Sequence, residues 1–191
     1  MMKLLKDLWA NETFRREAKE WAQSIAIALV LTLVIRTYIV QAFKIPSGSM
    51  RPTLIEGDKL FVNKFIYRFH EPQRGDIVVF KYPQDKKKDF IKRLVATGGE
   101  TVEIRDGKIL VDGKTLDDPD RFGKFYYYNH DPFGGPYEKI KVPADNYYVL
   151  GDNSANSTDS RFWGFVPKKN MIGKAIFRWW PLNRLGSLET K

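Results

Sequence analysis

Apolar and polar residues follow different patterns in the first 43 residues and in the rest of the chain. From Trp21 to Phe43 the only charged side chain is Arg36. About 23 residues at about 1.5 Å each span about 34 Å, more than the roughly 30 Å of a hydrocarbon core. The pattern predicts one N-terminal transmembrane helix over residues 21–43, preceded by a charged segment over residues 1–20.

Two other interpretations of this apolar run stay open. The uncharged stretch from Trp21 to Ile35 is short enough for a buried helix of a soluble domain. A cleaved signal peptide is the second interpretation, because Val40 and Ala42 fit a small-residue cleavage pattern. The charged segment before the run is long for a signal peptide, so an uncleaved signal-anchor is favoured. Charge does not fix its orientation, since residues 1–20 hold five basic and four acidic side chains.

Beyond residue 50 the pattern changes to short apolar runs bounded by turn residues, which is typical of β-strands. These runs are KLFVNKFIY, GDIVVFKY, DFIKRLVA, ETVEIRDGKILVDGK, NYYVLGDN and GKAIFRWW. Asp106-Gly107 between two of them predicts a tight hairpin. Residues 116–143 are rich in aromatic residues, Gly, Pro and Asp, and predict an excursion from the main sheet. The expected fold is a mainly-β domain of coiled antiparallel sheet over residues 44–191, tethered by the helix.

Composition excludes several kinds of site. The 191-residue chain has no cysteine and only two histidines, His70 and His130, which argues against thiolate or histidine-rich metal centres and cysteine nucleophiles. The net charge of +9 is scattered except for Lys86–Lys88, which we expect in a solvated hairpin loop. Contact of these lysines with lipid headgroups is a lesser interpretation, and nucleic-acid binding is not expected.

Candidate chemistry begins with KIPSGSMRPTL, directly after the apolar run. Prolines stiffen this segment and Gly48 permits close backbone approach, so Ser47 or Ser49 is a candidate nucleophile. Lys92 is the candidate base, because it lies inside an apolar strand where lost solvation lowers a lysine pKa. A Ser-His-Asp triad using His70 or His130 is the alternative.

A third cluster, GDNSANSTDSRFWGF, follows the strand YYVL and predicts a hydrogen-bonding loop at the end of the sheet. In it, Ser157 is a candidate to hold the lysine amine in place. Asp152 and Asp159, together with Arg93 and Arg161, are expected to form supporting salt bridges.

Four motifs, IPSGSMRPTL, RGDIVVFKYP, FIKRLVATGGETV and GDNSANSTDSRFWGFVP, stand in this order after the apolar run. In this order they resemble the type I signal peptidases of bacteria, and the likeness extends from the anchor to WPLNRLGSL. The resemblance implies that Ser49 is the nucleophile and Lys92 its general base. It also implies that the Ser47 hydroxyl joins the Ser49 amide in an oxyanion hole, and that Ser157 orients the lysine.

The resemblance further implies a supporting ion pair of Asp159 with Arg161. One departure is ATGGE, residues 96–100, where the family often has Gly-x-Pro-Gly-Asp. No cofactor and no metal are implied. The implied partners are signal peptides of exported preproteins and the lipid bilayer, with no nucleic acid.

The implied location is the bacterial cytoplasmic membrane, crossed once, with residues 1–20 cytoplasmic and the catalytic domain outside. The implied reaction is removal of signal peptides after a small residue. Two alternatives are a Ser-Lys self-cleaving regulator and a membrane-tethered β module that binds partners through KFYYYNHDPFGGPY without catalysis.

Overall fold

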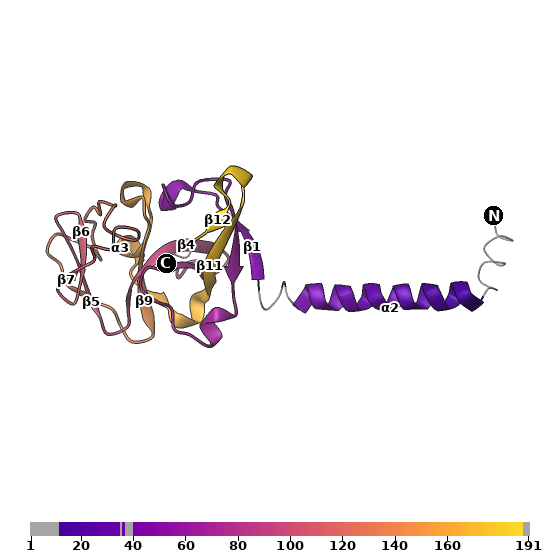
Figure 1. Cartoon of the computed structure of the whole chain (residues 1–191). Helices are drawn as coiled ribbons and strands as arrows, with labels where there is room; N and C mark the ends of the chain where they lie inside the picture. The colour runs from indigo at the N-terminus through magenta and orange to yellow at the C-terminus, as the bar shows by residue number, and fades with distance from the viewer. Residues whose placement is uncertain (1–11, 35, 37–39, 189–191) are drawn as a thin grey trace. The chain divides into compact units, whose positions relative to one another are not determined.

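A computed structural model of the chain describes residues 12–34, 36 and 40–188. The chain divides into two compact units, with the boundary between residues 39 and 40. Among the described residues, the first unit contains the helix α2 (Glu12–Val34), and the strands lie in the second unit (Figure 1). The prediction of a mainly-β domain with an antiparallel sheet is confirmed for the second unit.

The helix differs from the predicted residues 21–43 at both ends. Within the described residues it extends N-terminally from Trp21 to Glu12, where Arg15 and Arg16 lie within 4.0 Å of Glu12 and Glu20 one turn away. Residues 40–43 belong instead to strand β1 (Val40–Lys44), which pairs along its whole length with β2 (Lys59–Asn63). The predicted positions 1–11, 35 and 37–39 lie outside the described residues. Across residues 12–34, 36 and 40–188, no helix combines the length and hydropathy needed to cross a membrane.

The main sheet is eight-stranded and antiparallel, in the order β1-β2-β11-β3-β4-β9-β10, with β12 beside β11. Its further strands are β3 (Ile77–Lys81), β4 (Asp89–Thr97), β9 (Asn146–Leu150), β10 (Val166–Pro167), β11 (Met171–Trp180) and β12 (Gly186–Ser187). The expected hairpin between β3 and β4 is present, and Lys86–Lys88 are exposed in its loop.

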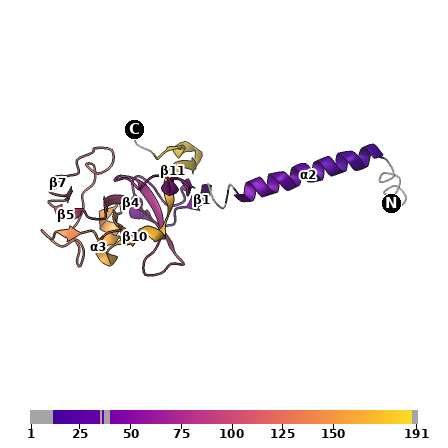
Figure 2. The same cartoon turned by 90° about the horizontal axis from the view of Figure 1, so that it is seen from below.

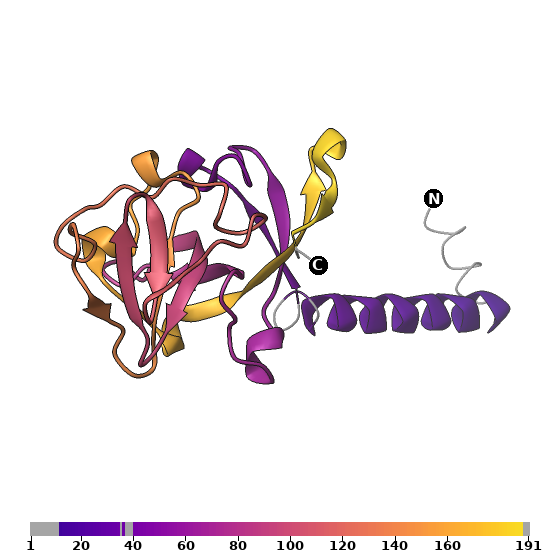
Figure 3. The same ribbon diagram turned by 60° about the vertical axis from the view of Figure 1, so that its left-hand side comes forward.

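The second sheet is four-stranded, in the order β7-β6-β5-β8. Its strands are β5 (Thr101–Arg105), β6 (Lys108–Val111), β7 (Lys114–Thr115) and β8 (Ile140–Lys141). Within the second unit this sheet lies at the opposite end from β1 (Figures 1 and 2). Asp106 and Gly107 both have positive φ, 50° and 75°, so the predicted tight hairpin between β5 and β6 is confirmed (Figure 3).

The departure from the main sheet begins earlier in the chain than the expected residues 116–143. The departure from the main sheet begins with β5 at Thr101, since the β5–β6 hairpin pairs with β8 rather than with the main sheet. The buried side chains of this hairpin pack with Phe122 and Tyr127 of the irregular segment that follows. Hairpin and irregular segment therefore form one packed layer.

Short one-turn helices complete the second unit. They are η2 (Gly48–Met50), η3 (Ile66–Arg68), η4 (Ser154–Asn156), α3 (Ser160–Trp163), η5 (Lys168–Asn170) and η6 (Leu182–Arg184). Among them, η2 is anchored in the core, because Met50 and the following Leu54 are fully buried among Leu60, Val62 and Ala175 of β2 and β11. The turn that starts directly after β1 is therefore part of the core of the main sheet.

Candidate active site

The turn η2 presents Ser49 from a closed section of backbone. The Ile45 amide donates to the Asp58 carbonyl at 2.8 Å, and the Gly57 amide donates to the Ile45 carbonyl at 2.9 Å. These two bonds join the ends of a loop that we call the serine loop, residues 45–58. Met50 fixes the loop to the core, and the adjacent Ser49 is buried, with 6% of its surface exposed. The nucleophile candidate is thus held by packing and by backbone hydrogen bonds.

Lys92 reaches the serine loop from the middle of β4. Its amine Nζ lies 2.6 Å from Ser49 Oγ, and both side chains are buried. Strand β4 pairs with β3, placing Lys92 opposite Val78 in an apolar part of the sheet. The amine also lies 5.6 Å from the centre of the Phe90 ring. Two residues far apart in the sequence therefore form one hydrogen-bonded pair.

Burial changes the proton affinity of this lysine. Removal from water, the largest effect, lowers the pKa of Lys92 to about 8, and the charges of Asp159 and Asp152 oppose that shift. A lysine with this pKa is neutral in about one molecule in ten at pH 7, against about one in a few thousand for a solvated lysine. The amine is therefore poised to accept a proton near neutral pH.

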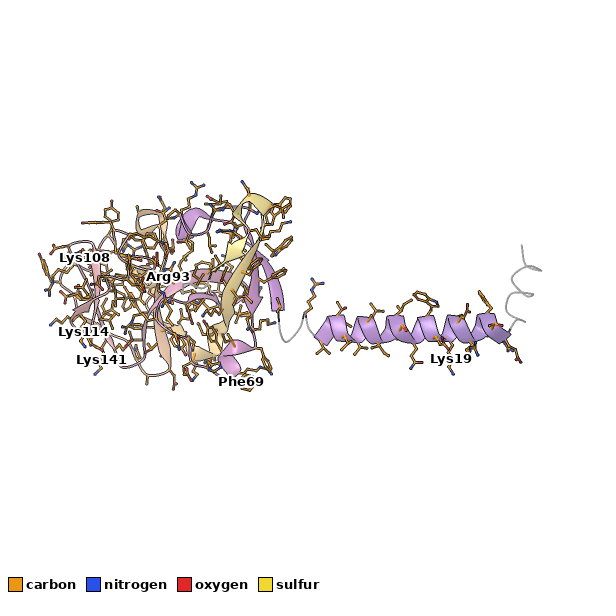
Figure 4. The ribbon with its side chains drawn as sticks, viewed as in Figure 1. Lys19, Phe69, Arg93, Lys108, Lys114 and Lys141 are labelled. Atoms are coloured by element: carbon orange, nitrogen blue, oxygen red, sulfur yellow. The ribbon has the colours of Figure 1, made fainter. Side chains whose placement is uncertain are left out.

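Two buried ion pairs flank the Ser49–Lys92 pair. Arg93 binds Asp152 through two hydrogen bonds, Nε to Oδ1 at 2.7 Å and Nη2 to Oδ2 at 2.6 Å. Arg161 binds Asp159 in the same way, at 2.8 and 2.9 Å. Figure 4 labels Arg93 within the body of the second unit, whereas Lys108, Lys114 and Lys141 lie toward the outside of the second sheet. Asp159 and Arg161 form the ion pair that the resemblance implies, and Asp152, which was expected in a salt bridge of unspecified partner, pairs with Arg93.

The second pair ties the site to the second layer. Asp159 caps α3 and accepts from the Gly151 amide at 3.0 Å. Arg161 donates to the Tyr128 carbonyl and to Ser154 Oγ, each at 2.7 Å. The loop after β9 is therefore held both by its bond to Gly151 at the end of the strand and by the bond of Arg161 to the second layer.

The two remaining serines of the predicted site are placed differently. Ser47 caps η2 in an extended conformation, is exposed, and lines the same pocket as Ser49. Ser157 is buried, but its hydroxyl has no hydrogen-bond partner within the described part of the chain. The expected hydrogen bond from Ser157 to the lysine amine is thus not formed, and the hydroxyl lies instead beside Gly151.

An open pocket of about 330 Å³ leads to the Ser49–Lys92 pair. Its lining residues are Pro46, Ser47, Ser49, Asp89, Phe90, Ile91, Lys92, Asn156 and Thr158. The lining comes from the first half of β4, from the start of the serine loop and from the loop after β9. A chain segment in the pocket would meet apolar side chains, the serine hydroxyl and the lysine amine together.

Neither histidine takes part in this arrangement. His70 and His130 are exposed, and the His130 ring contacts the Phe162 ring at a tilt of 35°, with ring centres 3.7 Å apart. The base beside Ser49 is Lys92, so the histidine triad is not the arrangement found. In residues 12–34, 36 and 40–188, no group of three acidic or histidine side chains could hold a metal ion.

Two residues near Ser49 have contacts that the sequence analysis did not assign. The Asn153 amide donates to the Ser49 carbonyl at 3.1 Å, and its side-chain Nδ2 donates to the Gly48 carbonyl at 3.0 Å. Thr53 Oγ1 donates to Asp152 Oδ2. Thr53 lies in IPSGSMRPTL and Asn153 in GDNSANSTDSRFWGFVP, but local spacing does not reveal which distant segment either residue contacts.

A buried serine–lysine pair at the base of an open pocket, on a mainly-β domain, is the arrangement of a serine–lysine hydrolase. The family described as signal peptidase, peptidase S26, matches residues 18–180. Signal peptidase I of Leptolyngbya laminosa is 43% identical over 176 residues, covering 88% of this chain and 83% of that protein. Signal peptidase I of Aquifex aeolicus is 37% identical over 206 residues, covering 78% of this chain and 79% of that protein.

Among solved structures, a signal peptidase I from Enterococcus faecalis is 32% identical, covering 55% of this chain and 97% of that chain with a TM-score of 0.43. The chain belongs to the signal peptidase family, peptidase S26. It is accordingly an enzyme, a serine endopeptidase of the kind that removes signal peptides from preproteins.

Proposed function

We propose that this protein removes signal peptides by a Ser49–Lys92 dyad. The observation that carries the proposal is the hydrogen bond of 2.6 Å between Lys92 Nζ and Ser49 Oγ, both buried at the base of an open pocket. Neutral Lys92 takes the Ser49 proton, and Oγ attacks the carbonyl carbon of the scissile bond. The resulting oxyanion accepts hydrogen bonds from the Ser49 amide and the Ser47 hydroxyl.

The reaction then proceeds in two balanced steps. The Lys92 ammonium gives its proton to the departing amine as the C–N bond breaks, which leaves the signal peptide joined to Ser49 as an ester. A water molecule next loses a proton to Lys92 and attacks this ester. When the C–Oγ bond breaks, the proton returns to Ser49 and both residues regain their starting states.

The substrate is proposed to bind in an extended conformation, and the family resemblance implies small side chains at its first and third positions before the cut. Strand β9 pairs with β4 from Arg93 onward. Residues 89–91 of β4 therefore have a strand partner, β3, on one side only within the described residues. An extended peptide is able to add to the other side as a further strand, with its scissile carbonyl beside Ser49.

The proposed location is the bacterial cytoplasmic membrane, with a single pass and the catalytic domain on the outer face. Its support is the absence of charged residues from Trp21 to Val34 of α2. A signal peptide crosses the membrane as an apolar helix, so its cleavage site lies just outside the bilayer. Ser49 follows the apolar run by only a few residues in the sequence, which supports a nucleophile that acts close to the membrane.

Cleavage of a preprotein by the purified full chain tests the proposal. The parent should release a mature protein whose new N-terminus, read by mass spectrometry, follows a small residue. Ser49→Ala should be inactive, whereas Ser47→Ala, which keeps the amide donor, should lose about 3 kcal/mol of transition-state stabilisation. Equal residual activity in the two variants would overturn the assignment of Ser49.

The same assay separates the two alternatives. A self-cleaving regulator would process its own chain and leave the preprotein intact. A binding module would leave the preprotein intact in every variant. Either result with folded parent protein would contradict the proposed function.

A further inference from the structure

The second half of the serine loop is held by two arginines from the C-terminal end of the second unit. Arg178, in β11, donates through Nη1 to the Thr53 carbonyl at 3.0 Å. Arg184, in η6, donates through Nη2 to the same carbonyl at 3.3 Å. Figures 1 and 3 show the turn after β1, in purple, and the C-terminal segment, in yellow, at the same end of the main sheet.

Arg184 also grips the residue that closes the loop. Its Nη2 lies 3.2 Å from Asp58 Oδ2, which accepts from the Ile55 amide at 3.0 Å as well. The Asp58 side chain is fully buried, and its backbone carbonyl is the partner of Ile45. The arginine therefore contacts both the middle and the end of the serine loop.

Thr53 connects this grip to the catalytic strand. While its carbonyl accepts from the two arginines, its hydroxyl donates to Asp152, the partner of Arg93. Arg93 directly follows Lys92 in β4. A continuous series of hydrogen bonds thus runs from Arg184 through Thr53 and Asp152 to the backbone that carries the base.

This network is expected to contribute little net free energy to the stability of the fold. Two arginines face one buried aspartate, and Asp58 Oδ1 and Arg184 Nε have no hydrogen-bond partner within the described residues. Buried ionic groups often contribute little net stability, because desolvation offsets their attraction. Their bonds do have direction, and here they fix the loop that bears Ser49 relative to the strand that bears Lys92.

We propose that Arg178 and Arg184 are positioning residues that set the distance between Ser49 and Lys92 through Thr53 and Asp58. The inference rests on the proposed function and deepens it, since it assigns the C-terminal segment a part in the same reaction. Neither arginine lines the substrate pocket. Their loss should therefore lower kcat rather than raise KM.

The test measures kcat and KM of the full chain in detergent with a preprotein substrate, at a temperature where every variant is folded by circular dichroism. Arg184→Gln should lower kcat about ten- to a hundredfold, as expected for a slightly misplaced nucleophile, with KM within about twofold of the parent. Arg184→Lys should recover part of kcat, because one ammonium reaches one of the two acceptors. Arg105→Gln is the matched control: it also deprives a buried carboxylate, Glu103, of its arginine, but in the second sheet.

Thr53→Val decides the question if Arg184→Gln does not fold. It keeps the shape of the side chain and removes only the hydroxyl bond to Asp152, and it should lower kcat about tenfold. An unchanged kcat in a folded Arg184→Gln or, failing that variant, in Thr53→Val would overturn the positioning role while the proposed function stands. A fall of kcat in Arg105→Gln equal to that in Arg184→Gln would also overturn it, by revealing a general effect of stability. A folded parent without activity would overturn the proposed function, and the positioning role with it.

Discussion

Asn153 holds the backbone of Ser49 in place: its amide donates to the Ser49 carbonyl at 3.1 Å. The contact joins the loop after β9 to the serine loop, two segments that lie far apart in the sequence. The Ser49 side chain meanwhile bonds to Lys92. The orientation of the nucleophile is therefore set by a residue that makes no contact with its reacting atom.

The closeness of these two loops makes Gly151 intolerant of substitution. A Cβ at Gly151 would lie 2.2 Å from Ser157 Oγ and 2.5 Å from the Ser49 carbonyl oxygen. Gly151→Ala should displace the serine loop and lower kcat about a hundredfold. Gly186→Ala is the control, because a Cβ there meets no atom within 4 Å. Normal turnover by a folded Gly151→Ala variant would contradict this account of the site.

The pH dependence of cleavage should report the buried lysine. Since only the neutral amine accepts the Ser49 proton, kcat should rise with pH through an apparent pKa of about 8 and level off above it. Lys92→Arg should be inactive at every pH in this range, because guanidinium stays protonated. A pH–rate profile of parent and variant makes the comparison. Substantial turnover by Lys92→Arg would remove lysine as the base.

The same lysine should cost the protein stability at neutral pH. The unfolded chain keeps this proton up to about pH 10.5 and the folded chain releases it at about pH 8, so stability rises between these values. The pKa shift corresponds to a destabilisation of the folded state by about 3 kcal/mol, and the hydrogen bond to Ser49 offsets about 1 kcal/mol of it. Lys92→Met should therefore be more stable than the parent by about 2 kcal/mol at pH 7.

Urea unfolding at several pH values measures this difference. The gap between Lys92→Met and the parent should close as pH rises from 8 to 10.5. Lys108→Met, at an exposed lysine of β6, should show no such change. A gap that is constant with pH would show that the lysine is not strained by burial.

Breaking the buried Asp159–Arg161 pair should lower the stability far more than breaking a surface pair. Arg161→Met leaves a fully buried carboxylate without its cation and should lower the free energy of unfolding by about 3–5 kcal/mol. Lys88→Met, which breaks an exposed pair with Asp85, should change it by less than about 0.5 kcal/mol. Urea unfolding at pH 7 compares the two variants. Similar losses in both would mean that solvent screens the buried pair.

The sequence predicted the strands well where polarity alternates or changes sharply, as in Asp89–Thr97 and around Asp106-Gly107. It failed where one apolar stretch changes structure. Val40 and Phe43 are as apolar as the helix before them, so hydropathy alone does not reveal that β1 begins there. The predicted helix left out Glu12 to Glu20 because these residues are mostly polar, although they are good helix formers and belong to α2.

Within the site, residue type was enough to nominate Lys92 and the four charged residues, since a lysine among apolar neighbours is rare and acid–base pairs attract. It left Ser47 and Ser49 open as nucleophiles, and only the resemblance to the signal peptidases favoured Ser49. Contacts between segments that are far apart in the sequence could not be predicted from the residue pattern. Asn153 and Thr53 bind backbone or carboxylate groups across the fold. The predicted contact of Ser157 with the lysine amine failed for the same reason, because only the fold determines which way the Ser157 hydroxyl points.

Strand β1 has a mechanical consequence for the enzyme. It stands in the chain between α2 and the serine loop, and it is paired with β2 along its whole length, from Val40 to Lys44. Tension on the N-terminal helix must break this ladder of backbone hydrogen bonds before it reaches Ile45. The pairing of β1 with β2 therefore protects the position of Ser49 from a pull on the chain before Val40.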